Sequence, residues 1–120
     1  MDRETTFDEI KLKVKEFCEE RDWDRFHNAK ELATALTLEA SELLEPFRYK
    51  SEKEVDELFL DSNKKSNIED EMADIIMLLF RMAQRYDIDL SDAFFRKIDS
   101  IAKKYPVDKV KGQNKKYDEY

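Results

Sequence analysis

Residues 68–80 read IEDEMADIIMLLF, and this stretch decides the fold because it holds the longest apolar run in the chain. From Met72 to Phe80 apolar side chains occupy nearly every side of a helix, so we expect the central, most buried helix here. One acidic residue, Glu71, nevertheless interrupts an apolar face of that helix at about 100° per residue. The apolar members of this face are Ile75, Leu78 and Met82.

A second predicted helix contains LTLEASELLE, residues 36–45, and it repeats this pattern. Glu39 falls inside an apolar stripe made by Leu32, Ala35, Leu36 and Leu43. Glu39 and Glu71 each have a second acidic residue three positions further on. This residue lies on nearly the same side of the helix, because three residues are close to one turn. The two acidic pairs are Glu39 with Glu42 and Glu71 with Asp74. An antiparallel helix pair would bring them face to face.

Carboxylates in an apolar setting need a positively charged partner, because burying an unpaired carboxylate costs several kcal/mol and neighbouring ones repel each other. All-oxygen ligation selects Mg²⁺ or Mn²⁺ over zinc or copper. A di-iron site would need Glu-x-x-His on two helices, and the single histidine, His27, follows no such motif. We therefore predict a Mg²⁺ site, with Mn²⁺ as a substitute, that holds a phosphorylated ligand through the metal.

Composition favours one all-α domain. The chain has 120 residues but only 1 Gly and 2 Pro, and a multi-stranded protein needs these residues for its turns. A net charge of −7 argues against duplex nucleic acid or an anionic membrane as a partner. We expect a cytoplasmic protein for three reasons. The chain has a single cysteine, it shows no apolar leader, and its longest apolar run is far shorter than the roughly 20 residues that span a bilayer.

We expect an all-α bundle of four to five helices, with the active site on two long antiparallel helices and completed by a second subunit. The predicted helix-start residues are Thr5 or Thr6, Asn28, Ser51, Ser66, and Asp89 or Ser91. Pro46 should end or bend the second helix at Glu45. Residues 61–67 are expected to form a polar loop. The predicted domain is 1–112, followed by a polar tail, 113–120.

In order, the chain contains RDWDRFHNAKELATALTLEASELLEPFRYK (21–50), IEDEMADIIMLLFRMAQRYDIDLSDAFFRKID (68–99) and KKYPVDKVKG (103–112). This order resembles the all-α nucleoside triphosphate pyrophosphatases, the MazG-like superfamily, and most of all their dCTP pyrophosphatase-like branch. The resemblance covers most of the chain. It implies Mg²⁺-dependent hydrolysis of a (d)NTP to the (d)NMP and diphosphate, which would clear surplus or non-standard pyrimidine deoxynucleotides.

The same resemblance implies roles for individual residues. The residues that match the family's metal ligands are Glu39, Glu42, Glu71 and Asp74. We expect Glu42 and Glu39 to be catalytic, with Glu42 as the general base at the edge of its apolar stripe. The positions that match base-binding residues are Trp23, His27 and Tyr49. The candidates for phosphate binding are Lys97, Lys104, Lys109 and Lys111.

The resemblance further implies a homodimer or homotetramer in which helices from two chains build one site. One position departs from the family: Ile101 stands where many relatives have Asn, which leaves the nucleotide preference open. Three alternatives also stay open. They are phosphoribosyl-ATP pyrophosphatase activity, a nucleotide-binding regulator without turnover, and a structural helical module whose acids are only solvated.

Overall fold

The structure is a computed structural model that describes residues 1–119. Within these residues the chain is helical and has no strand, which confirms the predicted all-α class. The chain divides into two compact units, Met1–Asp87 and Ile88–Tyr120. The first unit carries both acidic pairs.

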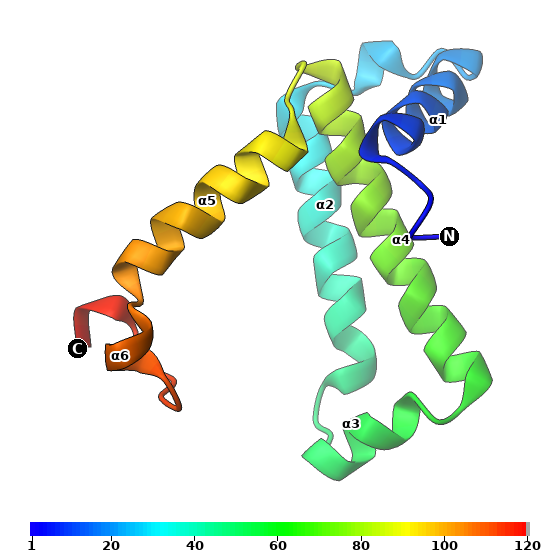
Figure 1. Ribbon diagram of the computed structural model, residues 1–120. Coiled ribbons are helices and arrows are strands. Elements are labelled where there is room, and N and C mark those ends of the chain that lie inside the picture. The colour runs from blue at the N-terminus through cyan, green and yellow to red at the C-terminus, as the bar shows by residue number, and fades with distance from the viewer. Residues whose placement is uncertain (120) are drawn as a thin grey trace. The chain divides into compact units, whose positions relative to one another are not determined.

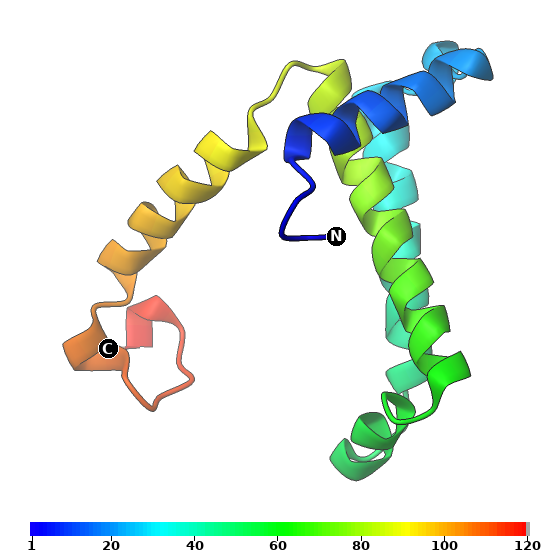
Figure 2. The ribbon, with the colours of Figure 1, turned by 45° about the vertical axis from the view of Figure 1, so that its right-hand side comes forward.

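Two long helices form the frame of the first unit. Helix α2 (Ala29–Leu44) and helix α4 (Ser62–Arg85) lie side by side and antiparallel (Figures 1 and 2). The short helix α3 (Glu52–Leu58) connects them at one end, and α1 (Phe7–Glu20) packs on the C-terminal half of α4. The predicted antiparallel helix pair is therefore confirmed.

The core of this unit is small and concentrates where α1 meets the helix pair. The buried apolar side chains there are Val14, Cys18, Leu32, Phe80 and Ala83. The Phe7 ring meets the Phe80 ring edge-on, with 4.9 Å between the ring centroids. Leu58 and Ile68 are buried at the opposite end, beside α3. The apolar contacts thus hold both ends of the pair.

Most predicted helix starts agree with the structure. The side chains of Thr6 and Ser51 each cap a helix in a reciprocal capping box, and Asn28 and Asp89 accept a hydrogen bond from the first turn of their helices. Pro46 lies in the 3₁₀ turn that follows the end of α2. Local side-chain chemistry is therefore sufficient to set these boundaries.

The predicted start of α4 is wrong. Ser66 does not cap this helix, and residues 61–67 do not form a loop, because α4 already begins at Ser62. Asp61 is the cap: its Oδ1 accepts hydrogen bonds from the backbone N–H groups of Asn63 and Lys64, at 3.0 and 3.1 Å. No Gly or Pro separates these residues from the apolar run, so the helix extends back to the first good acceptor.

Among the described helices α4 has the most buried residues, as predicted, but it is not buried on all sides. Met72, Ile76 and Leu79 are 51%, 44% and 40% exposed, and they recur at helical spacing on one stripe. Within the first unit, α1 and α2 are the helices that pack extensively against α4. The elements of the first unit therefore leave an apolar stripe of α4 uncovered.

The second unit consists of α5 (Leu90–Lys104), α6 (Val107–Val110) and a 3₁₀ turn (Tyr117–Glu119). The Tyr105 hydroxyl accepts a hydrogen bond from the Tyr117 backbone N–H at 3.2 Å, which joins the end of α5 to this turn. The predicted tail thus contains ordered structure up to position 119. None of the helices in residues 1–119 has the length and apolar composition that crossing a membrane requires.

Candidate active site

Three of the predicted metal ligands meet between α2 and α4. One carboxylate oxygen from each of Glu39, Glu42 and Glu71 lies within 4.8 Å of the other two. The first two occupy successive turns of α2, and Glu71 faces them from α4. The fourth predicted ligand, Asp74, is exposed and lies outside this group, although its charge still acts on Glu39. The three grouped acids are hereafter the carboxylate cluster.

The electrostatics of the carboxylate cluster are unfavourable without a cation. The Oε2 atoms of Glu39 and Glu71 are buried and have no hydrogen-bond partner in the described part of the chain. Burial and the negative charges of Glu42 and Asp74 raise the pKa of Glu39 to about 7. A divalent cation would supply the missing partner and offset the repulsion, and carboxylate oxygens are the donors that Mg²⁺ and Mn²⁺ prefer. The residues present therefore fit such an ion.

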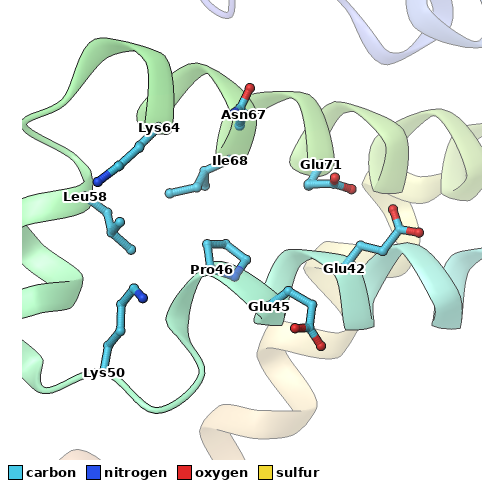
Figure 3. Close-up of a pocket in the computed structure, with 9 residues that line it drawn as sticks. All are labelled: Glu42, Glu45, Pro46, Lys50, Leu58, Lys64, Asn67, Ile68 and Glu71. Atoms are coloured by element: carbon cyan, nitrogen blue, oxygen red, sulfur yellow. The ribbon is translucent and has the colours of Figure 1, made fainter.

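A pocket of about 500 Å³ lies beside the carboxylate cluster and includes two of its acids, Glu42 and Glu71 (Figure 3). Lys50 and Lys64 also line this pocket, from the segment after α2 and from α4. In Figure 3 the lysines lie at one end and the carboxylates at the other. Lys64 precedes Glu71 by two helical turns, roughly 10 Å along the axis. One end of the pocket is therefore negatively charged and the other end is positively charged.

The lysines of this pocket are not among the site residues predicted from the sequence. Lys50 ends the segment FRYK, which the resemblance already included, so its sequence signal was present but received no role. Lys64 lies in the predicted loop 61–67, and a loop has no helical register. In the structure α4 includes Lys64 and places it on the same face as Glu71. A correct cap at Asp61 would have revealed it.

The structure brings two of the predicted base-binding residues together. The rings of Trp23 and His27 meet edge-on with 5.9 Å between their centroids, and Trp23 is 37% exposed. Both lie just before α2, whereas Glu39 stands roughly 16 Å further along that helix. Tyr49 follows the other end of α2 and is 93% exposed. One chain therefore does not bring Tyr49 to the other two rings.

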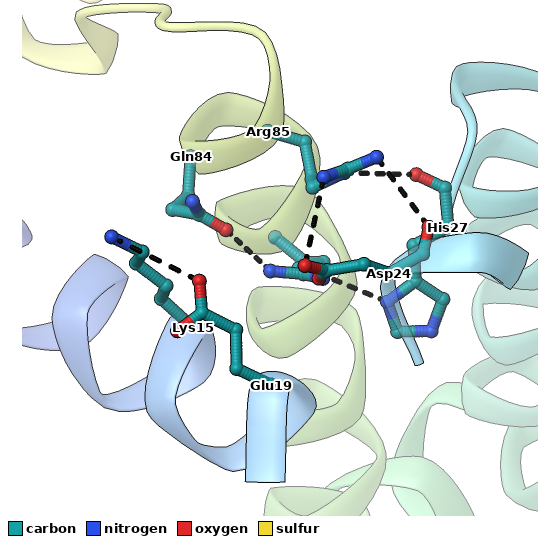
Figure 4. A network of polar contacts seen from close by, with 7 residues as sticks. Lys15, Glu19, Asp24, His27, Gln84 and Arg85 are labelled. Atoms are coloured by element: carbon teal, nitrogen blue, oxygen red, sulfur yellow. Dashed lines mark hydrogen bonds and ion pairs between the residues drawn. The ribbon is translucent and has the colours of Figure 1, made fainter. Parts of the chain in front are cut away.

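A polar network surrounds His27 (Figure 4). Arg81 of α4 is 1% exposed; its Nε donates to His27 Nδ1 at 3.0 Å, and its guanidinium forms an ion pair with Asp24. Arg85 donates to the backbone carbonyls of His27 and Asp24, both at 3.4 Å. This network is not predicted from the sequence, although Arg81 stands directly after the apolar run.

The predicted phosphate-binding lysines all belong to the second unit and are exposed. Lys97 and Lys104 lie on α5, Lys109 on α6, and Lys111 directly after it. The Lys104 ammonium lies 4.7 Å from the centre of the Tyr117 ring. Their contact with phosphate remains a prediction.

A comparison with protein families defines the class of this protein. The model of the MazG-like family matches residues 34–120, so the chain belongs to that family, within the all-α nucleoside triphosphate pyrophosphatases. This confirms the resemblance noted in the sequence, and it defines the class of the protein as a nucleoside triphosphate pyrophosphatase.

Individual relatives are consistent with this class. The chain is 33% identical over 114 residues to dCTP pyrophosphatase 1 of Mus musculus, which covers 95% of this chain and 67% of the relative. The Homo sapiens dCTP pyrophosphatase 1 is 31% identical over 116 residues, covering 97% of this chain and 68% of the relative. A crystal structure of a pyrophosphatase from Archaeoglobus fulgidus is similar with a TM-score of 0.77 and 31% identity, over 82% of this chain and 91% of that one.

Proposed function

We propose that this protein is a Mg²⁺-dependent nucleoside triphosphate pyrophosphohydrolase that removes surplus or non-standard pyrimidine deoxynucleotides. The observation that carries the proposal is the pair of buried, unpartnered oxygens on Glu39 and Glu71. Glu71 also lines the pocket that holds Lys50 and Lys64. The similarity to dCTP pyrophosphatases supports a pyrimidine substrate.

The carboxylate cluster would hold the metal, with Asp74 as the fourth predicted ligand, and the bound Mg²⁺ would stabilise charge on the phosphoryl oxygens. A water oxygen forms the new bond to the α-phosphorus, and the bond from that phosphorus to the α–β bridging oxygen breaks. Glu42, the exposed member of the cluster, accepts the proton of the attacking water. The bridging oxygen leaves with the diphosphate.

Lys50 and Lys64 would neutralise the departing diphosphate at the positive end of the pocket. Among residues 1–119 neither ammonium lies within 4.0 Å of a carboxylate oxygen, although the charge of Lys50 helps to lower the pKa of Glu54. Each lysine is therefore available to a ligand without first breaking a salt bridge. The lysines of the second unit stay as further candidates for the same phosphates.

The reaction can be tested with Mg²⁺ and a panel of nucleoside triphosphates, assaying diphosphate against orthophosphate. Diphosphate and monophosphate in equal amounts are expected, with deoxycytidine triphosphate among the best substrates. Release of orthophosphate alone would refute the proposed bond cleavage.

Lys50→Gln and Lys64→Gln should each raise KM about tenfold, because a charge-assisted hydrogen bond to the substrate is lost. Lys30→Gln is the control and should leave KM unchanged, because Lys30 is exposed on α2 and lies outside the pocket.

We also propose that the active form is a homodimer or homotetramer whose sites use two chains. The uncovered stripe on α4 supports this, and so does the separation of Tyr49 from Trp23 by the length of α2, roughly 24 Å. In an antiparallel pair of chains, Tyr49 of one copy could approach Trp23 of the other. Mixing inactive Trp23→Ala and Tyr49→Ala chains should then restore some activity, because one site would be intact. No recovery after verified exchange of chains would refute the shared site.

A further inference from the structure

Arg81 is a charged side chain almost fully buried in the first unit, and the proposed reaction does not use it. A buried guanidinium is tolerated only when its donors are paired, so its partners show what it does. They are the Asp24 carboxylate, the Gln84 Oε1 at 2.5 Å and the His27 Nδ1 at 3.0 Å (Figure 4). The contact with His27 is unusual, because it joins a permanent cation to an imidazole.

This contact determines where the imidazole carries its proton. A guanidinium has donors and no acceptor, so Nδ1 of His27 must accept and must be unprotonated. The neutral ring then carries its single proton on Nε2. Nε2 has no hydrogen-bond partner among residues 1–119, and it is not one of the buried unpartnered atoms. The ring thus keeps a free donor on its other edge.

The charges around His27 favour the neutral ring. Arg81 and Arg85 of α4 face it as cations, and Asp24 is the facing anion. Burial and the charge of Arg81 lower the pKa of His27 below its ordinary value of 6.5, against the opposing effect of Asp24. Because Asp24 already pairs with both arginines, it does not favour a charged imidazole strongly.

We infer that Arg81 is a positioning residue that fixes His27 as a neutral hydrogen-bond donor through Nε2, directed to an acceptor on the nucleobase. The acceptor would be a ring carbonyl oxygen or an unprotonated ring nitrogen. Trp23, edge-on to the same imidazole, supplies an aromatic surface next to this ring. The nucleobase as ligand rests on the proposed function, whereas the proton position rests on the geometry alone.

The proton position can be measured in the unmodified protein. His27 is the only histidine in the chain, so its ring nitrogens give an unambiguous long-range ¹H–¹⁵N NMR spectrum. We expect an unprotonated Nδ1 and a protonated Nε2 at pH 7. A proton on Nδ1, or a doubly protonated ring at that pH, would overturn the inference without any variant.

Substitution separates the contact with the ring from the general charge of the network. Arg81→Met should remove the preference for the Nε2 proton and raise the pKa of His27 towards its ordinary value. Arg85→Met is the matched control, because Arg85 meets Asp24 and the His27 backbone but not the imidazole. An equal effect of both substitutions would contradict a specific role for Arg81. If Arg81→Met does not fold, the wild-type spectrum still decides.

A double-mutant cycle tests the link to the ligand. Arg81→Met should raise KM for the best triphosphate about tenfold, the effect of one lost hydrogen bond, and change kcat little. In a His27→Ala background it should add nothing, since it acts through the imidazole. Additive effects would overturn the inference. Absence of turnover with every triphosphate would refute the proposed function, while the NMR result would still establish or exclude the role of Arg81.

Discussion

At the residue scale, the unpartnered oxygens of Glu39 and Glu71 separate a ligand site from a solvated acidic surface. An exposed carboxylate forms hydrogen bonds with water, but these oxygens are shielded from water. Without a bound partner they therefore destabilise the folded state. A bound cation would remove that cost.

Glu39→Gln should weaken Mg²⁺ binding and turnover by about a hundredfold or more, because even residues that only orient ligands contribute up to that much. Without metal the variant should be as stable as the parent or more so, since a repulsive charge is gone. Calorimetric titration and thermal unfolding with and without Mg²⁺ would measure both effects. Glu16→Gln, exposed on α1, is the control. Unchanged Mg²⁺ affinity in Glu39→Gln would show that the ligand assignment is wrong.

The pH dependence of the metal-free protein should report the same residue. The pKa of Glu39 is about 7 when folded, against an ordinary 4.5, so between these values the folded state holds a proton that the unfolded state has released. The free energy of unfolding should therefore fall as pH rises from about 4.5 through about 7. Mg²⁺ affinity should rise over the same range, with proton release. Chemical unfolding at a series of pH values tests this.

Glu39→Gln provides the control for this pH effect. The substituted side chain does not titrate, so the decline in stability between these pH values should be reduced. An identical pH profile in Glu39→Gln and the parent protein would mean that another group is responsible. Calorimetry in buffers of different ionisation enthalpy would count the protons that Mg²⁺ displaces.

At the element scale, α4 shows how strongly a boundary affects the site. The first turn of this helix carries Lys64, two turns before Glu71, so the cap at Asp61 places a pocket lysine in register with a cluster acid. A helix that began at Ser66 would leave Lys64 in a loop with no fixed position.

Asp61→Ala should destabilise the protein by about 1 kcal/mol, the typical value for losing a helix cap, because two backbone N–H groups lose their acceptor. Ser66→Ala should change stability by less than about 0.5 kcal/mol, because Ser66 lies inside the helix and is exposed. Urea unfolding measures both. The reverse order of effects would indicate that α4 starts at Ser66 in solution.

Helix boundaries and types could be predicted because they depend on residues close in sequence. The capping box at Ser51 needs only Glu54, and the α2 cap at Asn28 needs only the N–H of Glu31. The error at α4 arose from a choice between two good local caps. The earlier cap is used because nothing between them stops the helix.

At the scale of the whole molecule, the stripe of Met72, Ile76 and Leu79 is the feature that the helices of the first unit leave uncovered. A continuous apolar stripe on a long helix is typical of a surface that another protein surface covers. The proposed homo-oligomer would supply that cover.

Ile76→Asp should dissociate the oligomer or weaken its association at least about a hundredfold, since a charge would be buried in an apolar contact. Ser66→Asp adds the same charge at an exposed polar position of the same helix and should leave association unchanged. Sedimentation velocity over a range of concentrations measures the difference. Equal behaviour of the two variants, with both folded, would exclude this stripe from the interface.

The sequence by itself determined the all-α class, the helix pair and the acidic residues that interrupt its apolar faces, because helical periodicity repeats over a few residues. Only the tertiary structure decided which acids group together, which lysines share their pocket and which side chain holds His27. Glu39 and Glu71 meet only when α2 and α4 pack, and Arg81 reaches His27 across 54 positions of sequence. Such contacts follow from the packing of distant segments, and no local pattern encodes them.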